Sequence, residues 1–231
     1  MTEDKNFINA FHSAPPPDWA LRQHKSILQR GWDFVGAPLR MVVLPDHQSE
    51  RLRLTSLRAE RLRVTLPELQ GRVLDVGCGD NMLLRLYRQR KPSDAAKVSV
   101  GADVFPWSSD ILQITNSATL PFPDGSFDTI SYLACLNHIP ERADALKEAN
   151  RLLRPGGRVI ATMIESFVGK IGHALWWYSE DKERKMHPDE LMGLDVSEMK
   201  ALLRHAGLTV TKHQKFGYGL NNLFVAEKPL S

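Results

Sequence analysis

The residues whose types and spacing point most directly to chemistry form segment 73–81, which reads Val-Leu-Asp-Val-Gly-Cys-Gly-Asp-Asn. The pattern predicts an apolar strand that runs into a turn with glycines at 77 and 79, followed by a helix from about Met82. Glycine permits backbone angles that a side chain forbids, and it lets a ligand lie directly against main-chain amides at the positive end of a helix. We therefore expect this turn to hold a cofactor with an acidic or carboxylate-bearing part.

A carboxylate follows at the end of the next predicted strand, in Val100-Gly-Ala-Asp103. Because the carboxyl ends of parallel strands meet at one edge of a sheet, Asp103 is expected beside the glycine turn, where it can accept both hydroxyl hydrogens of a ribose. The alternatives are a turn-forming Asp and glycines that serve packing alone. Met82 stands where a dinucleotide fingerprint has its third glycine, which disfavours a nicotinamide enzyme.

The elements that must position these residues alternate between strands and helices. Repeated strand–helix–strand units imply a parallel sheet covered by helices on both faces, a doubly wound α/β fold. A capping box at Asp195-Val-Ser-Glu198 predicts a further helix that ends at Gly207. The predicted strands are 72–76, 97–104, 129–133, 158–164, 208–214 and 222–226, and the other predicted helices are 82–90 and 142–153.

The chain before about Gly71 is different, because it is helical in pattern and rich in arginine. Asp18 is expected to cap a helix that ends at Gly31, and a second helix is expected over 49–66. We therefore divide the chain into a helical cap, 1–70, and a main domain, 71–231. The arginines between Arg51 and Arg63 either grip an anion or form a solvated face, and the interspersed leucines favour the face.

Four segments in order carry a resemblance to a known family. Leu74-Asp-Val-Gly-Cys-Gly79, Asp103, Leu120-Pro-Phe-Pro-Asp-Gly-Ser-Phe-Asp128 and Leu153-Arg-Pro-Gly-Gly157 resemble the successive motifs of class I S-adenosylmethionine-dependent methyltransferases, in the branch that includes the quinone-biosynthesis enzymes. The resemblance implies a mostly parallel, seven-stranded Rossmann-like sheet whose antiparallel last strand lies between the fifth and sixth. It also implies S-adenosyl-L-methionine as cofactor and S-adenosyl-L-homocysteine as product.

The resemblance also assigns roles to individual residues. Asp103 is implied to hold the ribose, Asn116 to meet the adenine amino group with Ser117 beside it, and Leu133 to lie near the sulfonium. Asn81 departs from a third glycine that is common in the family, although Asn tolerates left-handed geometry. The residues implied to line the methionine part of the cofactor are Asp75, Gly77, Cys78 and Gly79.

Methyl transfer is an in-line displacement, which requires neither a metal nor a covalent residue but a positioned nucleophile and excluded water. If the acceptor is a hydroxyl, a base helps to remove its proton, and His138 is our hypothesis for that base. The alternative is that His138 packs or caps the following helix. Residues 165–194 form a predicted acceptor-side insertion, in which His173, Trp176, Trp177, Tyr178 and His187 either line a pocket or pack.

Composition sets the outer limits on function. The 231 residues are 42% hydrophobic and 25% charged with a net charge of +3, which is typical of a globular domain and does not by itself indicate nucleic acid. The two cysteines provide no disulfide framework, and no secretory signal or long apolar run is visible, so we expect a cytoplasmic protein with no integral membrane segment. Peripheral membrane contact and the oligomeric state stay open.

Taken together, the sequence predicts methyl transfer from S-adenosylmethionine to a small-molecule, lipid-like or sugar-containing acceptor, with O-methylation as the first choice. One alternative is a degenerate methyltransferase fold that serves as a binding or regulatory module. The other is an RNA methyltransferase, which would bind RNA through the arginine series with steep salt dependence. The absence of an interleaved basic and aromatic face disfavours nucleic acid.

Overall fold

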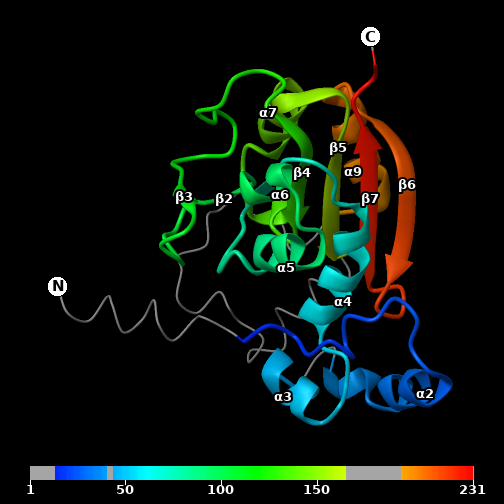
Figure 1. Ribbon diagram of the computed structural model, residues 1–231. Coiled ribbons are helices and arrows are strands. Elements are labelled where there is room, and N and C mark those ends of the chain that lie inside the picture. Colours follow the sequence, from blue (N-terminus) through cyan, green and yellow to red (C-terminus); the bar gives the residue numbers. More distant parts are fainter. Residues whose placement is uncertain (1–13, 41–43, 165–193, 231) are drawn as a thin grey trace.

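The computed structural model describes residues 14–40, 44–164 and 194–230 (Figure 1). Its centre is a seven-stranded sheet with the order β3-β2-β1-β4-β5-β7-β6. All neighbouring pairs are parallel except β5 with β7 and β6 with β7, so the antiparallel strand lies between the fifth and sixth as expected. The strands are β1 Val73–Val76, β2 Val100–Asp103, β3 Leu112–Gln113, β4 Phe127–Leu133, β5 Leu153–Ile164, β6 Thr209–Phe216 and β7 Asn221–Glu227.

Helices cover both faces of this sheet, which confirms the doubly wound architecture. On one face Leu146 of α7 and Leu203 of α9 join the core, and on the other Leu62 of α4 packs with Leu83 and Tyr87 of α5. Within the described ranges, no helix combines the length and apolar character that crossing a bilayer requires. The helices are α2 Ile27–Val35, α3 Asp46–Arg51, α4 Leu57–Thr65, α5 Met82–Arg90, α6 Asp94–Lys97, α7 Arg142–Leu152 and α9 Val196–His205, with short 3-10 turns η2 Leu66–Glu68 and η3 Leu136–His138.

The amino-terminal helices differ from the expected ones. The helix predicted from Asp18 to Gly31 is wrong, because residues 18–21 form a turn and α2 begins only after Ser26. The Ser26 hydroxyl accepts a hydrogen bond from the Gln29 amide at 3.2 Å, which is the usual N-cap interaction. The helix then continues through Gly31, a residue that costs stability in a helix interior but does not end it.

The helix predicted over 49–66 is in fact two helices, α3 and α4. Arg53 has a left-handed φ of 58°, which interrupts the helical path. The Asp33 carboxylate stabilises the segment between the two helices. It accepts hydrogen bonds from the amide and from the hydroxyl of Thr55, each at 2.8 Å. Ser56 then caps α4 by accepting from the Ala59 amide at 3.1 Å. A tertiary contact from α2 therefore decides the break, and periodicity within 49–66 does not reveal it.

The helices α2 and α3 lie at the carboxyl ends of the parallel strands (Figure 1). The turn between β6 and β7 meets them there, because Tyr218 lies 6.0 Å from the Phe34 ring and the Arg40 guanidinium lies 5.0 Å from the Tyr218 ring. Tyr218 is thus engaged with the amino-terminal helices. The division at residue 70 stays a prediction.

Candidate cofactor and active site

The glycine turn lies where β1 ends, pinned against the neighbouring strand β2. The Ala102 carbonyl accepts hydrogen bonds from the amides of Gly77 at 2.8 Å and Cys78 at 3.3 Å. Gly77 and Gly79 have left-handed φ values of 70° and 53°. A Cβ on Gly77 would stand 2.7 Å from the Cβ of Cys135, whereas one on Gly79 would meet nothing within 4 Å. The first glycine therefore permits close packing, and the second borders open space that a ligand can occupy.

Asn81 takes the place of a third glycine and keeps left-handed geometry, with φ of 62°. Its side-chain amide donates to the Asp110 carboxylate at 2.8 Å, which ties the glycine turn to the loop after β2. The amide of Met82, the first residue of α5, donates to the Asp80 carboxylate at 3.2 Å. Two carboxylates thus hold the carboxyl-terminal end of the turn, where α5 begins.

Asp103 lies beside the glycine turn, as the sequence predicts. One carboxylate oxygen accepts from the Gly79 amide at 2.9 Å and the other from the Phe105 amide at 3.1 Å. The residue is 8% exposed. A carboxylate offers about four acceptor positions, so two remain for the paired hydroxyls of a ribose. The geometry of this chain therefore fits a nucleoside at Asp103.

Asp75 lies deeper in the sheet, 2% exposed, and accepts a hydrogen bond from the Ser131 hydroxyl at 2.7 Å. Burial, together with the negative charges of Asp103 and Asp80, raises the pKa of Asp75 to about 7, although the Ser131 hydrogen bond acts in the opposite direction. With Asp110, four acids surround the turn, where Arg85 pairs with Asp80 at 3.0 Å. This acidic surrounding suits a ligand that carries positive charge.

The end of β4, the strand that pairs with β1 on the side away from β2, borders this site. Leu133 is half-buried, and the next residue, Ala134, has a left-handed φ of 54°. Its amide donates to the Thr162 carbonyl at 3.0 Å and lies 3.1 Å from the Thr162 hydroxyl. A positive φ at a residue other than glycine stores strain and is concentrated at functional sites. Ala134 therefore marks this strand end as specialised.

Both cysteines of the chain border the site and are free. The Cys135 thiol contacts the Val76 carbonyl at 3.1 Å. Burial, together with Asp75 and Asp103, raises the pKa of both the Cys78 and the Cys135 thiols well above the ordinary value. Both thiols therefore stay protonated at neutral pH, which fits a site that uses no covalent nucleophile.

His138 is the last residue of η3, five residues after the end of β4. Its backbone amide donates to the Cys135 carbonyl at 2.9 Å. Its ring Nε2 lies 3.0 Å from the Asn137 amide nitrogen, so the neutral ring that accepts this hydrogen bond carries its proton on Nδ1. The half-buried imidazole is held in position by its own turn.

Asn116 and Ser117 follow β3, on the side of the sheet where Asp103 lies. The side-chain oxygen of Asn116 accepts from the amides of Ala118 at 3.0 Å and Thr119 at 3.1 Å. These bonds use both lone pairs of that oxygen, so the acceptor role expected for it toward adenine is already taken within the turn. The amide nitrogen is the group that Asn116 offers a ligand. Ser117 is buried, 6% exposed.

The structure thus brings Asp75, the glycine turn and Asp103 together, and it adds residues that the sequence did not single out. Ser131, Asp110 and Thr162 orient the named groups, but they carry no motif, since each acts through a partner at least 28 residues away. The predicted insertion and its aromatic residues lie outside the described residues, apart from the buried Leu194.

Comparison with known proteins decides the family. A family profile described as a methyltransferase domain matches residues 47–213. The chain belongs to this methyltransferase family. It is 26% identical over 187 residues to the ubiquinone/menaquinone biosynthesis C-methyltransferase UbiE of Geobacter sulfurreducens, covering 69% of this chain and 73% of that protein. It is 27% identical to the 27-O-demethylrifamycin SV methyltransferase of Amycolatopsis mediterranei, covering 71% of this chain and 64% of that protein.

Solved structures with the same fold include an S-adenosylmethionine-dependent methyltransferase from Thermotoga maritima, with a TM-score of 0.52 and 20% identity over 73% of this chain and 88% of that one. The cyclase SpnF is also similar, with a TM-score of 0.55 and 18% identity over 88% of this chain and 96% of that one. This methyltransferase therefore uses S-adenosylmethionine and releases S-adenosylhomocysteine. Its relatives methylate both carbon and oxygen, so family membership leaves the acceptor atom to be argued from the site.

Proposed function

We propose that this methyltransferase transfers the methyl group to a hydroxyl oxygen of a small-molecule acceptor, a class that includes lipid-like and sugar-containing compounds. The observation that carries the proposal is the position of His138, on the turn that follows β4, next to the strained strand end at Ala134. A hydroxyl needs a base to remove its proton as the new bond forms, and imidazole is the side chain that most often serves as that base.

The cofactor supplies an electrophilic methyl carbon on a positively charged sulfur. Asp103 accepts the ribose hydroxyls while the Gly79 and Phe105 amides keep its carboxylate oriented. The open face of Gly79, with Cys78 and Gly77 behind it, holds the methionine part, and Asp75 adds negative charge beneath. Asn116 donates its amide to the adenine ring and Ser117 lies beside it, while Leu133 borders the sulfur and excludes water.

His138 removes the acceptor proton through Nε2, the ring nitrogen that carries no proton, where the acceptor hydroxyl takes the place of the Asn137 amide. The η3 turn holds the residue in place. The catalytic contribution of such a base is typically about 100-fold to 10,000-fold. Orientation of the acceptor oxygen behind the methyl carbon supplies the larger part, since displacement at carbon depends on alignment.

The cofactor site is tested by calorimetric titration with S-adenosylmethionine and S-adenosylhomocysteine. We expect Asp103→Ala to lose binding, because the paired hydroxyls lose their acceptor and the Gly79 amide loses its partner. Asp94→Ala is the matched control, since its side chain is 99% exposed in an i,i+3 pair with Lys97. Equal binding by Asp103→Ala and wild type would overturn the ribose assignment. Absence of binding by folded wild type would favour the degenerate binding module.

The base is tested by transfer of labelled methyl groups to a panel of phenols, catechols and hydroxylated lipids. We expect His138→Ala to slow turnover and to remove the acidic limb of the pH–rate profile, with S-adenosylhomocysteine binding unchanged. His205→Ala, an exposed histidine at the end of α9, is the control. An unchanged rate and profile in His138→Ala would leave that histidine a packing residue.

A further inference from the structure

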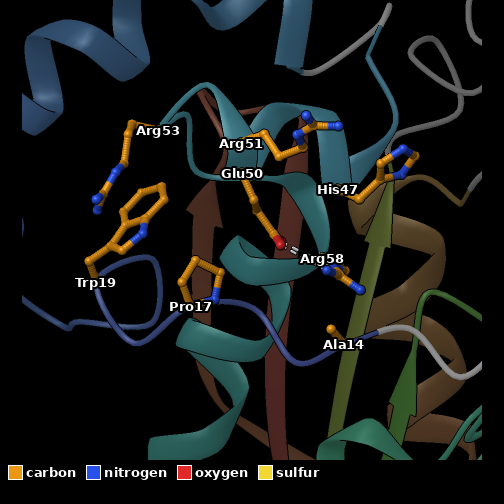
Figure 2. Close-up of a pocket in the computed structure, with 8 residues that line it drawn as sticks. All are labelled: Ala14, Pro17, Trp19, His47, Glu50, Arg51, Arg53 and Arg58. Atoms are coloured by element: carbon orange, nitrogen blue, oxygen red, sulfur yellow. Dashed lines mark hydrogen bonds and ion pairs between the residues drawn. The ribbon is translucent and has the colours of Figure 1, made fainter.

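A pocket of about 720 Å³ lies between the amino-terminal segment and helices α3 and α4 (Figure 2). In Figure 2 the segment that carries Ala14, Pro17 and Trp19 forms one wall, and the side chains of α3, α4 and their connection lie opposite it. The pocket is rich in cationic side chains. Its lining residues are Ala14, Pro17, Trp19, His47, Glu50, Arg51, Arg53 and Arg58.

The single carboxylate of this lining is fully engaged. Glu50 forms a bidentate pair with the Arg58 guanidinium, with N–O distances of 3.0 and 2.8 Å, and also accepts from the Ser56 hydroxyl at 2.6 Å. Within the described ranges, neither Arg51 nor Arg53 is paired with a carboxylate. The pocket therefore keeps two guanidinium groups beyond those that Glu50 neutralises, and it is complementary to an anion.

The connection between α3 and α4, which carries Arg53, is a well-defined loop. Arg53 has the left-handed φ of 58° that costs energy in a residue other than glycine. The carbonyls on either side are fixed, since the Trp32 indole donates to Leu52 at 3.0 Å and the Gln29 amide donates to Arg53 at 2.9 Å. The Arg53 guanidinium lies 5.7 Å from the centre of the Trp19 ring. The strained loop thus places a cation beside an aromatic surface.

The pocket lies close to the cofactor turn. Although burial lowers the pKa of the Arg58 guanidinium, the charges of Glu50, Asp46 and Asp80 outweigh it and raise that pKa. Asp80 belongs to the glycine turn, which places its charge within electrostatic reach of the pocket. The pocket wall formed by α3 also lies at the carboxyl ends of the parallel strands (Figure 1), the edge at which the cofactor site is built.

We propose that this pocket binds the anionic group of the methyl acceptor, a carboxylate or a phosphate ester on a planar ring system. Arg51 and Arg53 pair with the anion, and the Trp19 ring stacks on the planar part of the acceptor. The inference rests on the proposed function, because it names the acceptor class that the site accepts. It also gives a role to Arg51 and Arg53, which have no carboxylate partner among the described residues, whereas Arg58 pairs with Glu50 and Arg63 with Glu60.

The direct test measures binding without turnover. Phenyl phosphate, benzoate, inorganic phosphate and the neutral benzamide are titrated calorimetrically into the full chain saturated with S-adenosylhomocysteine. We expect phenyl phosphate and benzoate to bind, inorganic phosphate to bind more weakly because it lacks a ring, and benzamide not to bind. The double variant Arg51→Gln/Arg53→Gln should weaken phenyl phosphate binding by at least about tenfold, the loss expected for charge-assisted hydrogen bonds.

Control variants distinguish the loss of charge in the pocket from a general effect on net charge or folding. Lys147→Gln/Arg204→Gln removes the same charge from exposed positions of α7 and α9 and should leave phenyl phosphate binding unchanged. Arg51→Lys/Arg53→Lys keeps the charge and should recover part of the affinity. Equal phenyl phosphate binding by Arg51→Gln/Arg53→Gln and wild type, or no binding by wild type that still binds S-adenosylhomocysteine, would overturn the proposal. If wild type does not bind S-adenosylhomocysteine, the result would instead contradict the cofactor site.

Turnover supplies the second readout. In methyl transfer to 3,4-dihydroxybenzoate and to its neutral amide, Arg51→Gln/Arg53→Gln should raise KM for the carboxylate with kcat nearly unchanged, and should leave KM for the amide as in wild type. Such a split identifies an anchor for the anion and not a role in the chemical step. Equal effects on both acceptors would overturn the assignment.

Discussion

The sheet and the amino-terminal helices are stabilised in different ways. In the centre of the sheet, Val76, Ile130 and Ile160 are fully buried among apolar neighbours, as expected for strands covered on both faces. In the amino-terminal segment, ionised side chains occupy comparable positions, since Asp33 is 2% exposed and Glu60 is 3% exposed. Apolar burial sets few geometric demands, whereas buried ion pairs are directional.

The buried charges form one network. Lys25 contacts the carboxylates of Asp33 at 2.8 Å and Glu60 at 2.7 Å, and Arg63 contacts Glu60 at 2.6 Å. Burial raises the pKa of Glu60, but Lys25 and Arg63 outweigh it and hold that pKa below its ordinary value. The comparison teaches that the cofactor site is built on strands with an apolar core, while the helices beside the proposed acceptor pocket are held by directional ion pairs.

The largest effect on stability is expected from a substitution that breaks this network. Glu60→Ala leaves Lys25, Arg40 and Arg63 without their shared carboxylate, and we expect a loss of about 3–5 kcal/mol in the free energy of unfolding, because unpaired buried charges are costly. Chemical denaturation measures this loss. Asp144→Ala is the control, since its pair with Lys147 is 62% exposed on both sides and should cost less than about 1 kcal/mol. Similar losses in the two variants would contradict the comparison.

The sheet is also easier to predict from the sequence than the amino-terminal helices. The strands of the sheet, the helix Met82–Arg90 and the closing hairpin are predictable because local apolar runs, glycines and caps define them. The break between α3 and α4 is not, because Asp33 makes it from 22 residues away. β3 is equally unpredictable from the sequence, because it has only two residues and is defined by its pairing with β2.

The candidate site divides in a similar way. The glycine turn and Asp103 form a short motif at strand ends, so their meeting is predictable from topology alone. The engagement of the Asn116 oxygen is a local turn interaction that asparagine commonly makes. The pocket at Arg53 depends on the left-handed backbone of that residue and on Gln29 and Trp32 of α2. The sequence around Arg53 does not predict these contacts.

The second prediction uses opposite pH dependences in the two regions. Asp75, with its pKa raised to about 7, binds a proton in the folded state that the unfolded chain has lost, so its contribution to stability is full below about pH 4 and falls by about 1.4 kcal/mol per pH unit up to about pH 7. Asp33 and Glu60, with lowered pKa values, contribute above their unfolded values and lose that contribution as pH falls.

Asp75→Asn isolates the first of these effects. The variant should be more stable than wild type at about pH 8 and should lose most of that advantage at about pH 5, because only the ionised carboxylate is penalised by burial. Guanidinium titrations of both proteins at the two pH values measure the difference. A constant difference across this range would show that Asp75 does not titrate there.

A third and smaller effect links the same group to the cofactor. If Asp75 lies beside the positive part of S-adenosylmethionine, binding favours its ionised form, so affinity should rise by up to about tenfold as pH increases from about 6 to about 8. Calorimetry in buffers of different ionisation enthalpy should detect the released proton. Asp75→Asn should bind with a flatter pH dependence, and an unchanged dependence in that variant would separate Asp75 from the cofactor.

The smallest effect concerns Asn81, the one position of the turn where a general motif and this chain differ. Asn81→Gly removes the bond to Asp110 but relieves the left-handed backbone, so the opposing changes should leave stability within about 1 kcal/mol of wild type. Asn81→Ala loses the same bond and keeps the strain, so it should be the less stable of the two by about 1 kcal/mol. Thermal melting with and without S-adenosylhomocysteine compares them. If Asn81→Ala were as stable as Asn81→Gly, the backbone conformation would not be what selects asparagine here, and the Asp110 contact would carry the preference alone.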